Sequence, residues 1–80
     1  MSSLVVDYEP LAVHVKCTRD ALVVVLEDGR QISVPLVWFP RLQNANAAQR
    51  KNWRLIGGGI GIHWEDIDED VSIESLLALK

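Results

Sequence analysis

The residues whose types and spacing could do chemistry lie mainly between Gly57 and Asp70. This stretch opens with four glycines, at positions 57, 58, 59 and 61, which suggest a loop that cradles phosphate. A nucleotide-binding P-loop would also carry a lysine followed by serine or threonine, and the glycine spacing does not fit the dinucleotide pattern. The glycines therefore favour a strand turn or bulge with φ values that other residues avoid.

Acidic side chains follow the glycines, and five of residues 65–70 are aspartate or glutamate. Their Asp-x-Asp-x-Asp spacing copies the first ligands of a calcium loop, which would then require glycine where Val71 stands and glutamate where Leu77 stands. We therefore expect an exposed, solvated turn and no metal site. The acids that are candidates for contact with a partner protein are Asp66, Asp68, Glu69 and Asp70.

Cys17, His14 and His63 are the other groups capable of nucleophilic or metal chemistry. Cys17 and His14 are placed on opposite faces of one strand, and Cys17 is expected to be a small buried residue. His63, beside Trp64, could be a ligand, a proton shuttle or a half-exposed strand residue, and these two residues would lie next to any small ligand. No second histidine or cysteine has ligand spacing, which favours the strand residue. The sequence predicts neither an enzyme nor a cofactor.

Length and composition indicate one globular domain over residues 1–80, because 49% of the chain is hydrophobic. A single cysteine excludes an internal disulfide. Residues 1–7 lack the basic start and apolar run of a signal peptide, and no stretch approaches the roughly 18 apolar residues of a membrane span. We expect a cytoplasmic protein without membrane contact.

The net charge of −3 argues against general affinity for nucleic-acid phosphates. Four of the eight Lys and Arg residues nevertheless form a local basic segment that is free of acids: Arg41, Arg50, Lys51 and Arg54. This segment and the acidic one would suit contact between elements, protomers or partners. The three tryptophans could be core residues or a stacking platform for single-stranded nucleic acid, and the net acidity favours the core.

The elements that must position these groups follow from local patterns. Alternation over residues 11–17 and the valine-rich run 21–26 predict strands, and Asp28-Gly29 predicts a two-residue type I′ turn into a third strand that Pro35 ends. Further on, the sequence predicts a small helix over residues 44–52 capped by Asn46 and Gln49, strands on both sides of the glycines, and a last helix capped by Ser72. The fold class is therefore α+β: an antiparallel β-meander, a short middle helix, a further strand pair and a C-terminal helix.

The predicted hairpins set which side chains share a face. With a three-residue loop over residues 18–20 and a two-residue loop at Asp28-Gly29, Val23 pairs with Val15 and Val34 on the main core face. The opposite face then carries an apolar strip formed by Leu22, Val24 and Leu26. Burial of three such side chains is worth roughly 5 kcal/mol, which predicts a homodimer or a partner contact centred on Val24.

Several short motifs occur in an order that resembles a known family. They are Asp28-Gly29-Arg30, Val34-Pro35-Leu36, Trp38-Phe39-Pro40-Arg41-Leu42, Trp53, Ile56-Gly57, Gly61-Ile62-His63-Trp64, Asp68-Glu69-Asp70-Val71-Ser72-Ile73 and Leu76-Leu77. Together they resemble the small prokaryotic domain-of-unknown-function family numbered 2442, over roughly residues 11–79. Members commonly have proline after the tryptophan, where this chain has Glu65, a departure that should loosen the turn without changing the fold.

The resemblance implies a small α+β domain with no established activity and no catalytic residue. Genes for such proteins often neighbour that of a small partner protein, which implies a toxin–antitoxin relationship. Some relatives carry a following helix-turn-helix domain, and DNA binding by that extension is not expected of this chain. The leading hypothesis is a protein-interaction module, the antitoxin-like member of a two-protein system. The alternative is a domain that senses a small ligand or metal through His63, the glycines and the acids.

Overall fold

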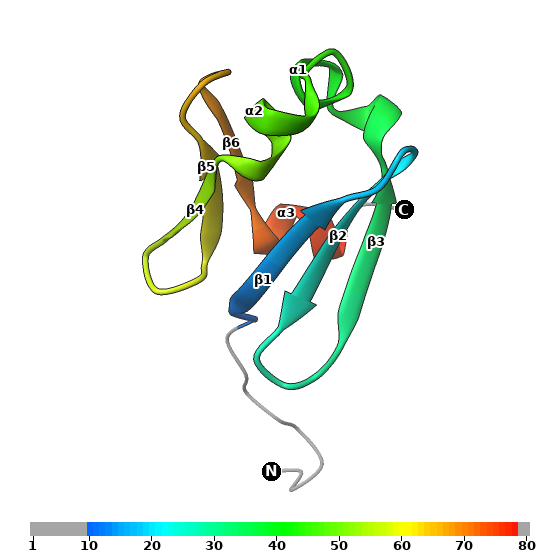
Figure 1. The fold of residues 1–80 in the computed structure, drawn as a ribbon. Coiled ribbons are helices and arrows are strands. Elements are labelled where there is room, and N and C mark those ends of the chain that lie inside the picture. The colour runs from blue at the N-terminus through cyan, green and yellow to red at the C-terminus, as the bar shows by residue number, and fades with distance from the viewer. Residues whose placement is uncertain (1–9, 79–80) are drawn as a thin grey trace, which may run out of the picture.

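The structure, a computed structural model, describes residues 10–78 of the 80-residue chain (Figure 1). These residues form two antiparallel sheets with the strand orders β1-β2-β3 and β4-β5-β6. In chain order the elements are β1 (Ala12–Cys17), β2 (Ala21–Leu26), β3 (Gln31–Pro35), the 3₁₀ turn η1 (Leu36–Trp38), α1 (Pro40–Gln43), α2 (Ala47–Lys51), β4 (Trp53–Ile56), β5 (Gly61–Trp64), β6 (Glu69–Ser72) and α3 (Ile73–Ala78). Figure 1 shows the two sheets next to each other, with α1 and α2 above them and α3 behind β1 and β2.

The predicted α+β class, the β-meander and the C-terminal helix are confirmed. The predicted strand pair is incomplete, because Glu69 and Asp70 belong to a third strand, β6, and not to the acidic turn. Val71 packs into the core, whereas Asp70 and Ser72 on either side of it are exposed. This two-residue alternation makes β6 a strand although its first half is acidic.

The local signals for turns and caps are confirmed. Asn46 and Gln49 form a capping box at the start of α2, and the hydroxyl of Ser72 accepts from the amide of Ser75 at 2.9 Å. Residues 57–59 all have positive φ, as the glycines predicted. The last of them also joins the two sheets, because the Gly59 carbonyl accepts from the amide of Ala12 in β1 at 2.8 Å.

Both hairpins of the first sheet differ from the prediction by one residue. Thr18 bonds to Ala21 through its main chain, so the first loop holds only Arg19 and Asp20. The second loop holds three residues, 27–29, of which Gly29 alone has positive φ. This is a turn followed by a left-handed glycine, and not a type I′ turn. Each change shifts β2 by one position against its neighbours.

A one-residue shift moves every side chain of a strand to the other face. Leu22, Val24 and Leu26 are therefore in the core, with 0%, 0% and 2% of their surface exposed. The prediction that they form a second apolar face is wrong. Val24 is inaccessible in the folded chain, so no partner contact can be centred on it. Val23 and Val25 occupy the outer face instead, opposite mainly polar neighbours.

The core lies between the two sheets and includes residues from α1 and α3. Trp64 is its largest fully buried side chain, and its indole N–H donates to the carbonyl of Arg50 in α2 at 3.1 Å. The core interpretation of the tryptophans is thus confirmed for Trp64, whereas Trp53 is half-buried and Trp38 is 45% exposed. No helix among residues 10–78 is long and apolar enough to cross a membrane.

Candidate functional site

His63 lies in a row of charged side chains on the second sheet. The strand register places it opposite Arg54 of β4 and Asp70 of β6. Its Nδ1 is 2.5 Å from a carboxylate oxygen of Asp70, and its Nε2 is 3.4 Å from Glu65, which also accepts from Arg54 at 3.3 Å. The ring is 12% exposed, so this row connects three strands with little water around its central member.

The electrostatics of this row favour a charged imidazole. The hydrogen bond to Asp70 is the main cause that raises the pKa of His63, with a further contribution from Glu65 and with burial opposing both. The hydrogen bond from His63, followed by that from Arg54, lowers the pKa of Glu65. Both ring nitrogens face carboxylates, which leaves neither free to ligate a metal or to pass a proton to a substrate. The arrangement is a cross-strand ion network.

The other candidate acids are also engaged within the chain. Asp66 accepts from the side chain of Asn52 at 3.1 Å, and the main-chain carbonyl of Asp68 accepts from Arg41 at 2.7 Å. Asp68 has a φ of 50°, which a non-glycine residue adopts in a tight turn. Glu69 accepts from the amide of Asp70. Within residues 10–78, no group of three or more histidine, cysteine or acidic side chains is arranged so that it could hold a metal ion.

The structure thus brings only part of the predicted set together. His63, Asp70 and Glu65 meet, whereas Trp64 on the same strand is buried in the core and cannot lie beside a ligand. The residues of the basic segment also separate in the structure, because Arg41 and Arg54 contact the acidic segment of their own chain. The two opposed patches therefore hold elements together, one of the uses expected of them.

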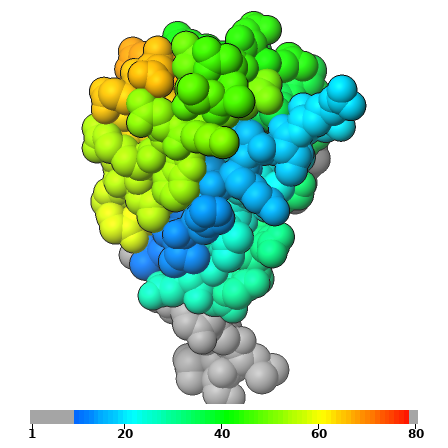
Figure 2. Space-filling model, viewed as in Figure 1, coloured from blue at the N-terminus to red at the C-terminus, as the bar shows by residue number. Residues whose placement is uncertain are grey.

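A groove that the sequence did not predict runs along β1, with a volume of about 460 Å³. One wall is the strand itself and the hairpin after it, residues 14–19, and the other wall is α2 with the first residue of β4. Figure 2 shows this side of the molecule, with β1 in blue beside α2 and β4 in green to yellow-green. At one end the ring of His14 meets Trp53 edge-on, with the ring centres 5.6 Å apart.

The β1 side of the groove is an edge of the first sheet, because β1 stands at the end of the strand order β1-β2-β3. The amide of Thr18 donates to Ala21 of β2 at 2.8 Å. Successive residues of an antiparallel strand direct their main-chain groups alternately toward and away from the partner strand. Lys16 and His14 thus bond with β2, and the main-chain groups of Val15 and Cys17 face away from it. Val15 is only 2% exposed, so the edge of β1 is covered at this point.

All the charged residues that line the groove are basic: Lys16, Arg19, Arg50 and Lys51. Arg50 is fixed in place, since it donates to the carbonyls of Leu42 and Gln43 at 2.9 and 2.7 Å. Within residues 10–78, Lys16, Arg19 and Lys51 form no ion pair. The groove is therefore electropositive although the chain as a whole is acidic.

Cys17 also lines this groove and is half-buried. Burial raises the pKa of its thiol, and the nearby charge of Arg50 only partly opposes this. A thiol with a raised pKa is protonated at neutral pH and is a weak nucleophile. The groove is consequently suited to binding and not to cysteine chemistry.

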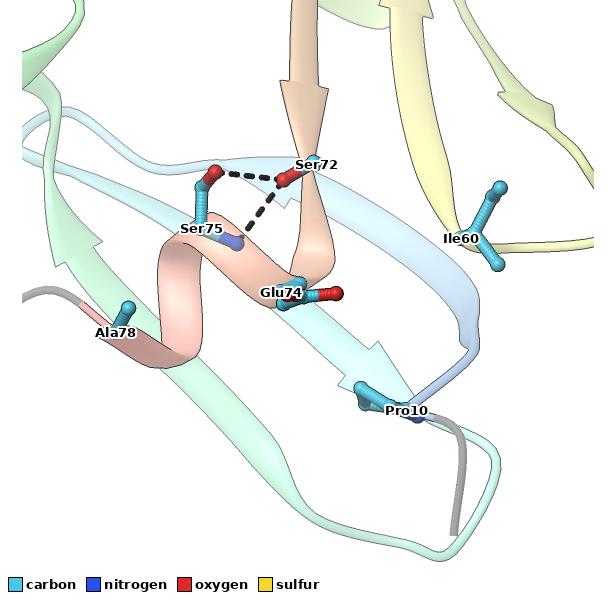
Figure 3. A pocket seen from close by; sticks show the side chains of 6 residues that line it. All are labelled: Pro10, Ile60, Ser72, Glu74, Ser75 and Ala78. Atoms are coloured by element: carbon cyan, nitrogen blue, oxygen red, sulfur yellow. Dashed lines mark hydrogen bonds between the residues drawn. The ribbon is translucent and has the colours of Figure 1, made fainter.

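A second hollow lies where the glycine turn approaches α3 (Figure 3). Its lining includes Ile60, Ser72, Glu74 and Ser75. The Ser72 hydroxyl bonds to the Ser75 hydroxyl and accepts from the Ser75 amide in the first turn of α3, as the dashed lines show. These polar groups are used in the helix cap, so the groove along β1 is the better candidate site.

The fold and the groove define a small α+β domain with a basic groove between β1 and α2. The chain belongs to the family described as "Protein of unknown function (DUF2442)", which it matches over residues 12–80. It is also similar to a protein of unknown function from Rhodospirillum rubrum ATCC 11170, whose crystal structure is known at 2.75 Å resolution. The two share 32% identity and a TM-score of 0.77, over 89% of this chain and 88% of the other. No curated protein matches the chain.

Proposed function

We propose that this chain is a non-catalytic protein-binding module whose partner occupies the groove along β1. The observation that supports this is a groove between β1 and α2 whose charged lining residues are all basic. A cluster of basic side chains without ion-pair partners attracts an acidic surface of another protein. The acidic segment is a poorer candidate, because most of its side chains already have partners within the chain.

The proposal keeps the form that the family resemblance implies, a cytoplasmic protein that works with one small partner, as an antitoxin does. It differs from the sequence-based expectation in where the partner binds. The proposed contact surface is the basic groove beside β1, because Leu22, Val24 and Leu26 are buried.

Co-purification with charge-reversed variants tests the proposal. The tagged chain, expressed at native level in its own host, should retain a protein in a stoichiometric amount. That protein should be lost from Lys16→Glu/Arg19→Glu and kept by Arg30→Glu, which reverses an exposed cation on the other hairpin. Purified components should reproduce the difference by calorimetry. A partner that binds all three forms equally would contradict a role for the groove.

A further inference from the structure

We infer that the edge of β3 binds a second copy of this chain, so that the first sheets of the two copies join into one continuous antiparallel sheet. This contact lies at the opposite edge of the sheet from the groove and does not depend on the proposed function. Three features of the β3 edge carry it: its exposure, the direction of its main-chain groups and its lack of charge.

The β3 edge is accessible. β3 stands at the end of the strand order β1-β2-β3, and Figure 1 shows it as the outer strand of the first sheet, on the side away from the second sheet. Gln31, Ser33 and Pro35 are all exposed. The helix that packs near β3 is α3, which approaches from the core side, where its Ile73 and Leu76 are buried. A second strand can therefore reach the β3 edge, whereas the edge of β1 is covered.

The main-chain groups of Gln31 and Ser33 point away from β2. On either side of them, the carbonyl of Arg30 accepts from β2 and the amide of Leu36 donates to the loop before β2, each at 2.8 Å. Bonded residues alternate along an antiparallel strand, so Gln31 and Ser33 direct their N–H and C=O groups to the open side. Within residues 10–78, no main-chain hydrogen bond from another element reaches these groups.

Two copies of this edge match each other about a two-fold axis. When Gln31 of one copy lies opposite Ser33 of the other, both main-chain groups of each residue are paired and the contact closes on itself. A register with Ser33 opposite Ser33 would place Pro35 opposite Gln31, and proline has no N–H to donate. The geometry therefore selects the first register, in which Ile32 lies opposite Ile32 of the second copy.

The charges of the two open sheet edges also favour β3. Natural proteins protect free strand edges with charged side chains. The edge strand of the second sheet, β6, carries Glu69 and Asp70, whereas no side chain of β3 is charged. The acidic segment, residues 65–70, belongs to the second sheet, so two copies with a net charge of −3 would meet at a neutral edge.

Exposed apolar side chains beside this edge would gain a neighbour in the pair. Val37 and Trp38 are 60% and 45% exposed and belong to η1, which follows β3 directly. The selected register places Leu36, the first residue of η1, opposite Asp28 in the β2–β3 loop of the second copy. Each η1 would thus lie beside the loop of the other copy.

The first test uses the native chain. Sedimentation equilibrium should show a dimer with a Kd below about 1 mM, the weak affinity of a small interface. Hydrogen exchange at the amides of Gln31 and Ser33 should slow in proportion to the fraction of dimer as the protein concentration rises. The amides of Ile32 and Val34, which face β2, should change little.

Paired charge variants test the register. Gln31→Glu/Ser33→Glu and Gln31→Lys/Ser33→Lys should each be monomeric at 1 mM, because like charges would lie directly opposite each other. An equimolar mixture of the two should form a heterodimer. Gln43→Glu/Ala48→Glu makes the same change in charge as the first variant on exposed positions of α1 and α2, and it should remain dimeric.

Several results would overturn the inference. A native chain that is still mainly monomeric at 1 mM would exclude the pair, and a dimer whose Gln31 and Ser33 amides exchange as fast as those of the monomer would place the contact elsewhere. A dimer that persists in both charge variants, or that is lost equally in Gln43→Glu/Ala48→Glu, would also contradict it. Circular dichroism checks that the variants fold, and if they do not, the exchange measurement on the native chain decides.

Discussion

The two charged regions of this molecule contrast in what their side chains contact. In the acidic region, residues 65–70, most of the carboxylates bond within the chain, to Arg54, His63, Asn52 or a nearby amide. Along the groove, by contrast, Lys16, Arg19 and Lys51 form no ion pair within residues 10–78. The conspicuous acidic run therefore holds the second sheet together, and the scattered cations are left to meet a partner.

This contrast shows why a run of like charges in a sequence is a weak guide to a binding site. The acids of residues 65–70 lie beside strands that carry Arg54 and His63, so folding provides their counter-charges. The cations of the groove come from two segments about thirty residues apart, β1 with its hairpin and α2. Their shared surface exists only after the sheets have come together.

The largest expected effect concerns the junction between the two sheets, because the groove forms only when the sheets have come together. Gly59→Ala should lower the free energy of unfolding by about 3 kcal/mol or more. The φ of Gly59 is +114°, and an added Cβ would lie 2.5 Å from the carbonyl oxygen of Ala12 in β1. Chemical denaturation followed by tryptophan fluorescence measures the change.

Gly58→Ala is the matched control for that junction. Gly58 also has a positive φ, +72°, but an added Cβ there would meet nothing within 4 Å. Backbone strain alone should cost about 1 kcal/mol. Equal losses in the two variants would contradict the close contact between the glycine turn and β1.

The elements of the fold were predictable where a local rule fixes them. Asn46 with Gln49 and Ser72 each cap the helix that follows, and the glycines at 57–59 adopt the positive φ for which glycine is suited. Each of these rules acts within a few residues of chain. Val71 and Leu76 stand at the two positions of a hydrophobic staple around the Ser72 cap, and both are buried.

Which side chains of β2 point into the core was not predictable, because the strand is apolar throughout and offers no alternation to fix its register. The loops decided it, and each differed by one residue from the predicted length. The groove could not be predicted for a related reason. Its two walls depend on the register of β1 and on the position of α2, which no single segment encodes.

An intermediate effect concerns the ion network of His63. The folded-state pKa of His63 is raised above 6.5, so its stabilisation is complete below pH 6.5 and is lost as the pH rises through the raised value. The pKa of Glu65 is lowered from 4.5, so its stabilisation is present above pH 4.5 and is lost as the pH falls through the lowered value. The network should therefore contribute most between pH 4.5 and 6.5.

Urea denaturation at pH 5.5 and pH 8.5 measures this dependence. The urea midpoint of the native chain should be lower at pH 8.5 than at pH 5.5. Asp70→Asn should reduce this difference, because it removes the main cause of the raised pKa of His63. His14→Gln changes the other histidine, which lies outside the network, and should keep the difference. A pH dependence that survives Asp70→Asn unchanged would count against the network.

The smallest expected effect compares one arginine from each region. Arg19→Glu should leave the free energy of unfolding within about 0.5 kcal/mol of the native value, because Arg19 is exposed and no ion pair of residues 10–78 includes it. Arg54→Glu makes the same change in charge but places a carboxylate beside Glu65, and its loss should be measurably larger at low salt. The difference should shrink in 1 M sodium chloride, since salt screens exposed charges. If Arg19→Glu were the more destabilising variant, the cations of the groove would be part of the fold, and the groove would not be free for a partner.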